Sequence, residues 1–75
     1  MVDKNELKSI VAEVLGIKTE VIKEDSKFVE DLGADSLDVT ELMLNIEDKF
    51  NIKIPDDQVG KFKTFKDLMD FLNGG

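Results

Sequence analysis

A serine flanked by carboxylates is the residue in this sequence best placed to carry chemistry. Ser36 lies three residues after Gly33 in the stretch EDLGADSLDVTEL, residues 30–42, and the chain has no histidine and no cysteine. A hydrolytic serine needs a base within hydrogen-bond reach, and no lysine lies between Lys27 and Lys49. Self-contained serine catalysis is therefore not expected, and we predict that the chain is not an enzyme.

Three other roles for Ser36 stay open on spacing alone. Ser36 could simply help to cap a helix, because serine and aspartate are common at helix starts. It could be a phosphorylation site that controls an acidic interaction module, where phosphate adds about −1.5 to −2 charge. It could also carry a phosphate-linked group, since a helix N-terminus offers unpaired N–H groups. The neighbouring acids oppose such a group electrostatically and are better explained as a recognition surface for the enzyme that attaches it.

The carboxylates around Ser36 do not form a convincing metal site or acid–base pair. Asp31, Asp35 and Asp38 lack the spacing of a calcium-binding loop and its closing glutamate. A short, exposed acidic helix also offers no pocket in which one carboxyl group would act as acid and another as base. We therefore expect no metal and no catalytic residue.

The distribution of charge indicates the kind of partner. The net charge is −7, from 17 acidic residues and 10 basic ones, all of which are lysines. Residues 30–57 contain nine of the acids and two of the lysines, so this segment accounts for the whole net charge. Nucleic acid is not an expected partner, because phosphate contacts need a basic face. The acidic segment would instead steer basic partners towards Ser36.

The apolar pattern predicts an all-α fold, a small four-helix bundle of three longer helices and one short helix. The expected helices are residues 3–15 with an Asp3/Glu6 capping box, 36–50 with an Asp35/Asp38 capping box, a short one at 55–60, and 64–72 with Thr64 as the cap and Asp67 three residues on. A long ordered loop joins the first two. We expect its apolar residues to be partly buried: Val21, Ile22, Phe28, Val29 and Leu32.

The 36–50 helix has a second face that points away from the expected core. Leu37 and Leu44 are seven residues apart and lie nearly opposite the core stripe, among carboxylates. Two leucines inside an acidic rim are typical of an interface. The predicted partner-binding residues, which we call the outer surface, are Asp35, Leu37, Asp38, Thr40, Glu41, Leu44, Glu47 and Asp48.

Length and composition suggest a single domain over residues 1–75. The chain has no long apolar run and no targeting pattern at its N-terminus, so we expect no membrane span. A cytoplasmic monomer is the expected state.

The stretch DLGADSLDVTEL, followed by IEDKFNIKIPDD, closely resembles the acyl carrier proteins of dissociated (type II) fatty acid and polyketide synthesis. The resemblance covers nearly the whole chain. It implies that Ser36 receives 4'-phosphopantetheine from coenzyme A through a phosphopantetheinyl transferase, and that acyl groups are carried as thioesters on this arm. The implied partners are acyl-transferring and elongating synthase enzymes with basic docking patches, and the arm and the partners supply the chemistry.

The resemblance also implies an apolar interior that shelters the acyl chain. The plausible lining here is Val29, Leu42, Ile46, Ile54, Phe62 and Leu68. Delivery to fatty acid synthesis is the expected function. A carrier dedicated to polyketide or aminoacyl groups is the alternative within the family, and a phosphorylation-controlled interaction module is the alternative outside it. The sequence departs from the family at Val39 and Thr40, whose order is often reversed, and in the less acidic segment DDQVGKFK.

Overall fold

The computed structural model describes residues 2–74 and contains four α-helices and one short 3-10 turn in that part of the chain. These elements are α1 (Lys4–Leu15), η1 (Thr19–Val21), α2 (Ser36–Phe50), α3 (Asp56–Val59) and α4 (Phe65–Leu72). Residues 2–74 form no strand, and only an isolated bridge joins Lys27 to Thr64. The predicted all-α fold with three longer helices and one short helix is confirmed.

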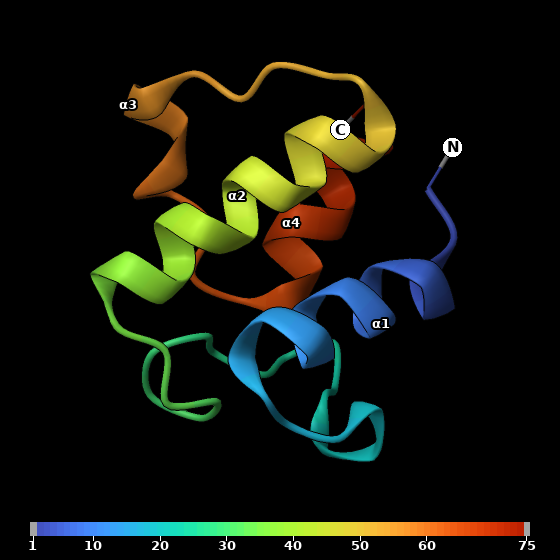
Figure 1. The fold of residues 1–75 in the computed structure, drawn as a ribbon, viewed down its shortest axis with the longest axis vertical. Coiled ribbons are helices and arrows are strands. Elements are labelled where there is room, and N and C mark those ends of the chain that lie inside the picture. The colour runs from blue at the N-terminus through green and yellow to red at the C-terminus, as the bar shows by residue number, and fades with distance from the viewer. Residues whose placement is uncertain (1, 75) are drawn as a thin grey trace.

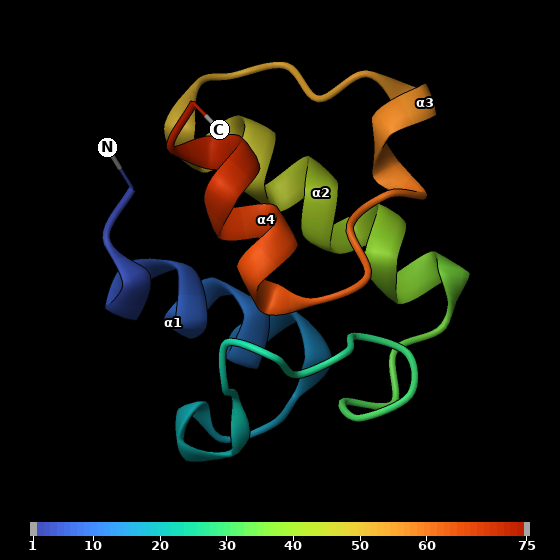
Figure 2. The same ribbon diagram turned by 180° about the vertical axis from the view of Figure 1, so that it is seen from behind.

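The helices surround a single apolar core. Figure 1 shows α2 across the middle with α1 below it, and Figure 2, from behind, shows α4 in front of α2. Each of these helices contributes side chains that are completely buried, and the long loop adds two that are almost so: Leu7, Val11, Leu42, Ile46, Phe65, Leu68, Ile22 and Phe28. Burying one such side chain stabilises the fold by about 1.5–3 kcal/mol.

The ends of α1 follow from local side-chain and backbone chemistry. The Asp3 carboxylate accepts a hydrogen bond from the Asn5 N–H at 3.0 Å. The predicted Asp3/Glu6 capping box is wrong, because the Asp3 carboxylate bonds the N–H of the second helical residue and not that of the third, Glu6. Gly16 ends the helix with φ 68° and ψ 35°, a left-handed conformation in which glycine has no steric penalty.

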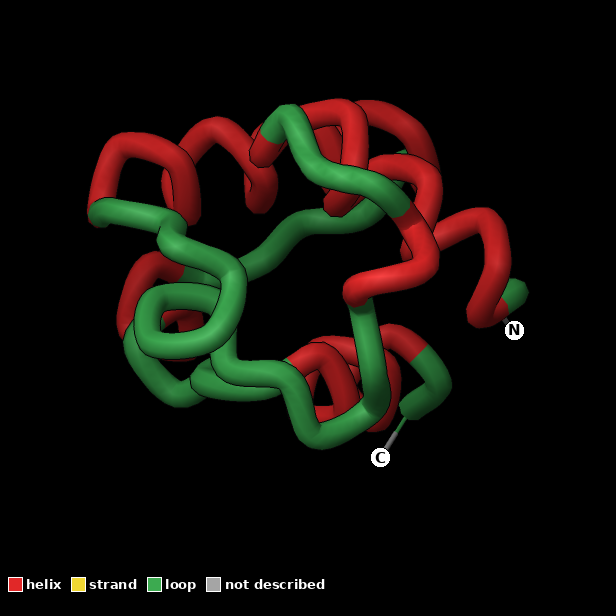
Figure 3. Tube along the Cα trace, turned by 90° about the horizontal axis from the view of Figure 1, so that it is seen from below, coloured by secondary structure: helices red, strands yellow, loops and turns green. Residues whose placement is uncertain are grey.

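The long loop between α1 and α2 lies at one end of the bundle, below both helices in Figure 1, and Figure 3 shows its path from that side. Ile22 and Phe28 anchor it in the core with exposures of 2% and 1%. The Phe28 N–H also donates to the Lys63 carbonyl at 3.0 Å, which ties the loop to the segment before α4. The expectation that Val21 and Val29 are partly buried is wrong, because these side chains are 52% and 60% exposed.

After α2, residues 51–55 run back along that helix and place α3 beside its first turns (Figures 1 and 2). The reversal begins at Asn51, whose φ of 53° lies in the left-handed region that asparagine tolerates better than most residues. The short α3 therefore lies close to the region around Ser36.

Candidate functional site

Ser36 is the first residue of α2, and its side chain is exposed. The backbone is fixed just before it, because the Ala34 N–H donates to the Phe28 carbonyl at 2.9 Å and Ala34 is only 4% exposed. Gly33, with φ 73°, makes the turn that this anchoring requires. A buried anchor two residues upstream thus holds an exposed hydroxyl in a defined place.

The cap of α2 is made by Asp35 and not by Ser36. The Asp38 N–H donates to the Asp35 carboxylate at 2.8 Å, and the Asp35 N–H donates to the Asp38 carboxylate at 3.2 Å. This is the predicted capping box. Within residues 2–74 the Ser36 hydroxyl makes no hydrogen bond to another protein group, so the interpretation of Ser36 as a mere cap is wrong.

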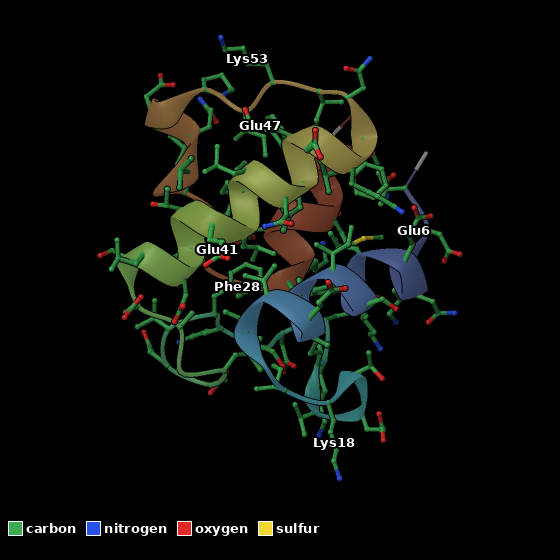
Figure 4. The ribbon with its side chains drawn as sticks, in the orientation of Figure 1. Glu6, Lys18, Phe28, Glu41, Glu47 and Lys53 are labelled. Atoms are coloured by element: carbon green, nitrogen blue, oxygen red, sulfur yellow. The ribbon has the colours of Figure 1, made fainter. Side chains whose placement is uncertain are left out.

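The structure places all predicted outer-surface residues on α2 or at its cap. Leu37 is 77% exposed and Leu44 is 60% exposed, as predicted from their spacing. Figure 4 shows Glu41 and Glu47 along the same helix, with Glu47 near the segment that carries Lys53. Two apolar side chains thus stand in solvent on an acidic helix, which is the arrangement of an interface core with a charged rim.

The carboxylates of this surface differ in what they bind. Asp35 and Asp38 are used in the capping box, and Glu47 accepts a hydrogen bond from the Ile54 N–H at 2.7 Å. Glu41 and Asp48 have no side-chain hydrogen bond or ion pair to any other part of residues 2–74. Sequence spacing identified Asp35 and Asp38 as a capping box, but it could not separate Glu47 from Glu41 and Asp48.

The groups with shifted pKa values lie away from Ser36. A hydrogen bond from the Thr19 hydroxyl lowers the pKa of Glu20, and the hydrogen bond and charge of Asp70 raise the pKa of Lys66. Both groups are on the surface, in η1 and α4. They give no acid or base that could activate Ser36.

An apolar hollow of about 460 Å³ opens beside Ser36, and we call it the Ser36 hollow. Its volume falls within the range of roughly 300–1,000 Å³ typical of small-molecule sites. The loop, the first turn of α2, α3 and the segment after α3 all contribute to its walls. The lining residues used below are Phe28, Val29, Ser36, Val39, Thr40, Val59 and Phe62.

The residues expected to line the acyl chain lie in three different places. Val29 and Phe62 line the Ser36 hollow. Ile54 instead lines a second hollow of about 270 Å³, and Leu42, Ile46 and Leu68 are fully buried in the core. The sequence could not identify Val59, because a four-residue helix is too short for its periodicity to define a face.

Among residues 2–74 there is no group of three or more potential metal-ligating His, Cys, Asp or Glu side chains. No helix in the same range is long and apolar enough to cross a membrane. The site therefore consists of an exposed hydroxyl, an adjacent apolar hollow and an acidic helix surface. By themselves these groups can accept, hold and present a covalently attached group, with the attaching chemistry supplied by another protein.

Comparison with known proteins gives the same picture. The family model described as "Phosphopantetheine attachment site" matches residues 5–72. The chain is 50% identical to the acyl carrier protein of Wolinella succinogenes over 68 residues, which are 91% of this chain and 90% of that protein. It is 52% identical over 68 residues to the acyl carrier protein of Sulfurovum sp., covering 91% of each chain. The acyl carrier protein of Helicobacter hepaticus is 46% identical over 66 residues, 88% of this chain and 87% of its own.

Proposed function

We propose a role for Ser36 from this premise: the chain belongs to the acyl carrier protein family, whose prosthetic group is a covalently attached 4'-phosphopantetheine. Members of this family are carriers and not catalysts, in agreement with the prediction that the chain is not an enzyme. The proposed attachment residue is Ser36. The observation that supports it is the exposed Ser36 hydroxyl at the start of α2. This hydroxyl makes no hydrogen bond to any other residue among 2–74.

The surroundings of Ser36 fit such a group. The start of α2 provides N–H groups and a dipole that favour a phosphodiester. The Asp35 and Asp38 carboxylates accept hydrogen bonds from each other's backbone N–H groups. When attached, the arm supplies a thiol that carries acyl groups as thioesters. The chain's own contribution is to fix the point of attachment and to offer the Ser36 hollow as a shelter from water for an apolar acyl chain.

Family membership implies contact with a phosphopantetheinyl transferase and with synthase enzymes in general. We propose that the outer surface of α2 makes these contacts. Leu37 and Leu44 would form the apolar centre. Glu41 and Asp48 would steer basic patches of the partners, since their carboxylates have no bond within residues 2–74 to give up. The proposed working state is a monomeric single domain in the cytoplasm.

The proposed pathway is fatty acid synthesis, in which the carrier delivers growing chains to elongating enzymes. The Ser36 hollow is lined by Phe28, Val29, Val39, Val59 and Phe62 together with the charged residues Lys27, Glu30 and Lys63, and most of its surface is apolar. Such a lining favours a hydrocarbon chain over a charged aminoacyl group, because an unpaired charge is costly to bury.

The test is a reconstituted elongation reaction with purified bacterial fatty acid synthesis enzymes and the phosphopantetheine-loaded carrier. Acyl chains that lengthen by successive two-carbon steps on the wild-type chain, and not on Ser36→Ala, are the expected result. Efficient loading without elongation would contradict the pathway and favour a carrier for polyketide or aminoacyl groups.

A further inference from the structure

Glu47 is the acid of the outer surface that reaches across to another segment of the chain. Its Oε2 accepts a hydrogen bond from the backbone N–H of Ile54 at 2.7 Å, in a partly buried setting. Glu41 lies on the same helix, is exposed, and has no such bond within residues 2–74. Glu47 therefore has a structural contact that its position on an acidic face does not explain.

This contact secures the connector formed by residues 51–55. The N–H groups of Asn51 and Ile52 donate to the Glu47 carbonyl, so the first part of the connector is already held by the main chain of this residue. Further along, Ile52 is 37% exposed, whereas Ile54 is only 4% exposed and belongs to the core. The Glu47 carboxylate thus satisfies a backbone N–H at the point where the connector re-enters the core, just before Pro55.

The same contact closes one end of the seam, which is our name for the line along which α2 and α3 face each other. The contact joins Glu47 of α2 to Ile54, which lies just before α3. Glu47 and Ile54 both line the second hollow, together with Thr40 and Val59. Thr40 and Val59 also line the Ser36 hollow. The two hollows therefore share Thr40 and Val59 in their walls, and the Glu47–Ile54 bond fixes the wall of the second hollow, which Ser36 does not line.

We propose that Glu47 is a positioning residue that holds this seam closed, and that a lysine or arginine of a docking partner competes for its carboxylate. A cation at Glu47 would form a charge-assisted pair with the acceptor that now serves Ile54. The connector and α3 would loosen, and the seam would open when a partner is bound. The step from an open seam to release of an acyl chain rests on the proposed function, whereas the closing role of Glu47 does not.

The closing role is tested by amide hydrogen exchange, followed residue by residue by NMR, in a Ser36→Ala background that cannot be loaded. Glu47→Ala should accelerate exchange of the Ile54 N–H by roughly 10- to 100-fold, the loss expected for a hydrogen bond to a charged acceptor. Glu47→Gln should restore most of the protection, because its amide oxygen still accepts. Glu41→Ala and Glu41→Gln are the matched controls and should leave Ile54 unchanged. Unchanged exchange of Ile54 in Glu47→Ala would overturn the proposal.

The competition is tested by adding a saturating amount of a phosphopantetheinyl transferase to the same unloadable chain. Exchange at Ile54 and in α3 should accelerate on binding, and in Glu47→Ala the transferase should cause no further acceleration. A bound transferase that leaves Ile54 protected would show that the Glu47–Ile54 bond persists in the complex, and the competition would be refuted. Failure of the proposed attachment at Ser36 would appear separately, as absence of loading in the wild-type chain.

Discussion

Leu37 is 77% exposed at the second position of α2, so replacing it with alanine should remove little native packing. Leucine and alanine are both good helix formers, and surface substitutions usually change the free energy of unfolding by about 0.5 kcal/mol or less. Leu42 on the same helix is 0% exposed and provides the matched control. Leu42→Ala should lower the free energy of unfolding by about 2–5 kcal/mol.

The effect of Leu37→Ala on partner binding should be much larger than its effect on folding. If the docking enzyme buries this side chain, alanine loses about 1.5–3 kcal/mol of transfer free energy. Since 1.4 kcal/mol corresponds to a factor of ten, kcat/KM for loading by the transferase should fall roughly 10- to 100-fold. Urea unfolding and initial rates of phosphopantetheine transfer measure the two effects on the same preparations.

Two results would refute this reasoning. A loss of more than about 2 kcal/mol in the free energy of unfolding of Leu37→Ala would mean that Leu37 packs against the fold in solution. A normal loading rate in a stable Leu37→Ala chain would mean that the transferase does not bury this side chain. Leu44→Ala, at a position 60% exposed, shows whether the contact extends further along α2.

Further predictions concern charge and backbone geometry. Glu41→Lys should slow loading at low ionic strength and much less near 1 M salt, where screening is strong. Glu6→Lys, at the start of α1, changes the net charge by the same amount and should slow loading less. Equal slowing by the two substitutions would contradict local steering. Gly16→Ala should lower the free energy of unfolding by about 1–2 kcal/mol, because alanine is strained at φ 68°. Thermal or urea unfolding checks this value, and an unchanged midpoint would show that the helix end relaxes to another conformation.

The helix boundaries could be predicted because their signals are local. Asp35 with Asp38, and Thr64 with Asp67, form capping boxes with the expected partners. Gly16 ends α1 in the left-handed conformation for the reason that makes glycine common there. Each of these features depends on residues within one helical turn, so no tertiary information was needed.

The long loop could not be predicted to the same depth. Without a repeating period, all its apolar residues were expected to be partly buried, yet Ile22 and Phe28 are buried while Val21 and Val29 are exposed. The choice among them depends on contacts with distant segments, such as the bond from the Phe28 N–H to the Lys63 carbonyl. Apolar character alone does not contain that information.

The hollows and the Glu47 contact depend on the path of the chain after α2. Of the residues expected to line the acyl chain, Leu42, Ile46 and Leu68 are fully buried in the protein core, whereas Val29 and Phe62 line the Ser36 hollow. Glu47 was predicted only as a docking acid, since nothing in its spacing indicates that the connector folds back to place the Ile54 N–H within 2.7 Å. A contact between segments that are distant in sequence becomes evident only in the three-dimensional structure.

The most direct test of the central claim is the intact mass of the chain after incubation with coenzyme A and a phosphopantetheinyl transferase. Wild type and Ser9→Ala, a control at an exposed serine on α1, should each gain one phosphopantetheine group, and Ser36→Ala should gain none. A folded wild-type chain that gains no mass, or a Ser36→Ala chain that is still modified, would contradict Ser36 as the attachment residue of this carrier.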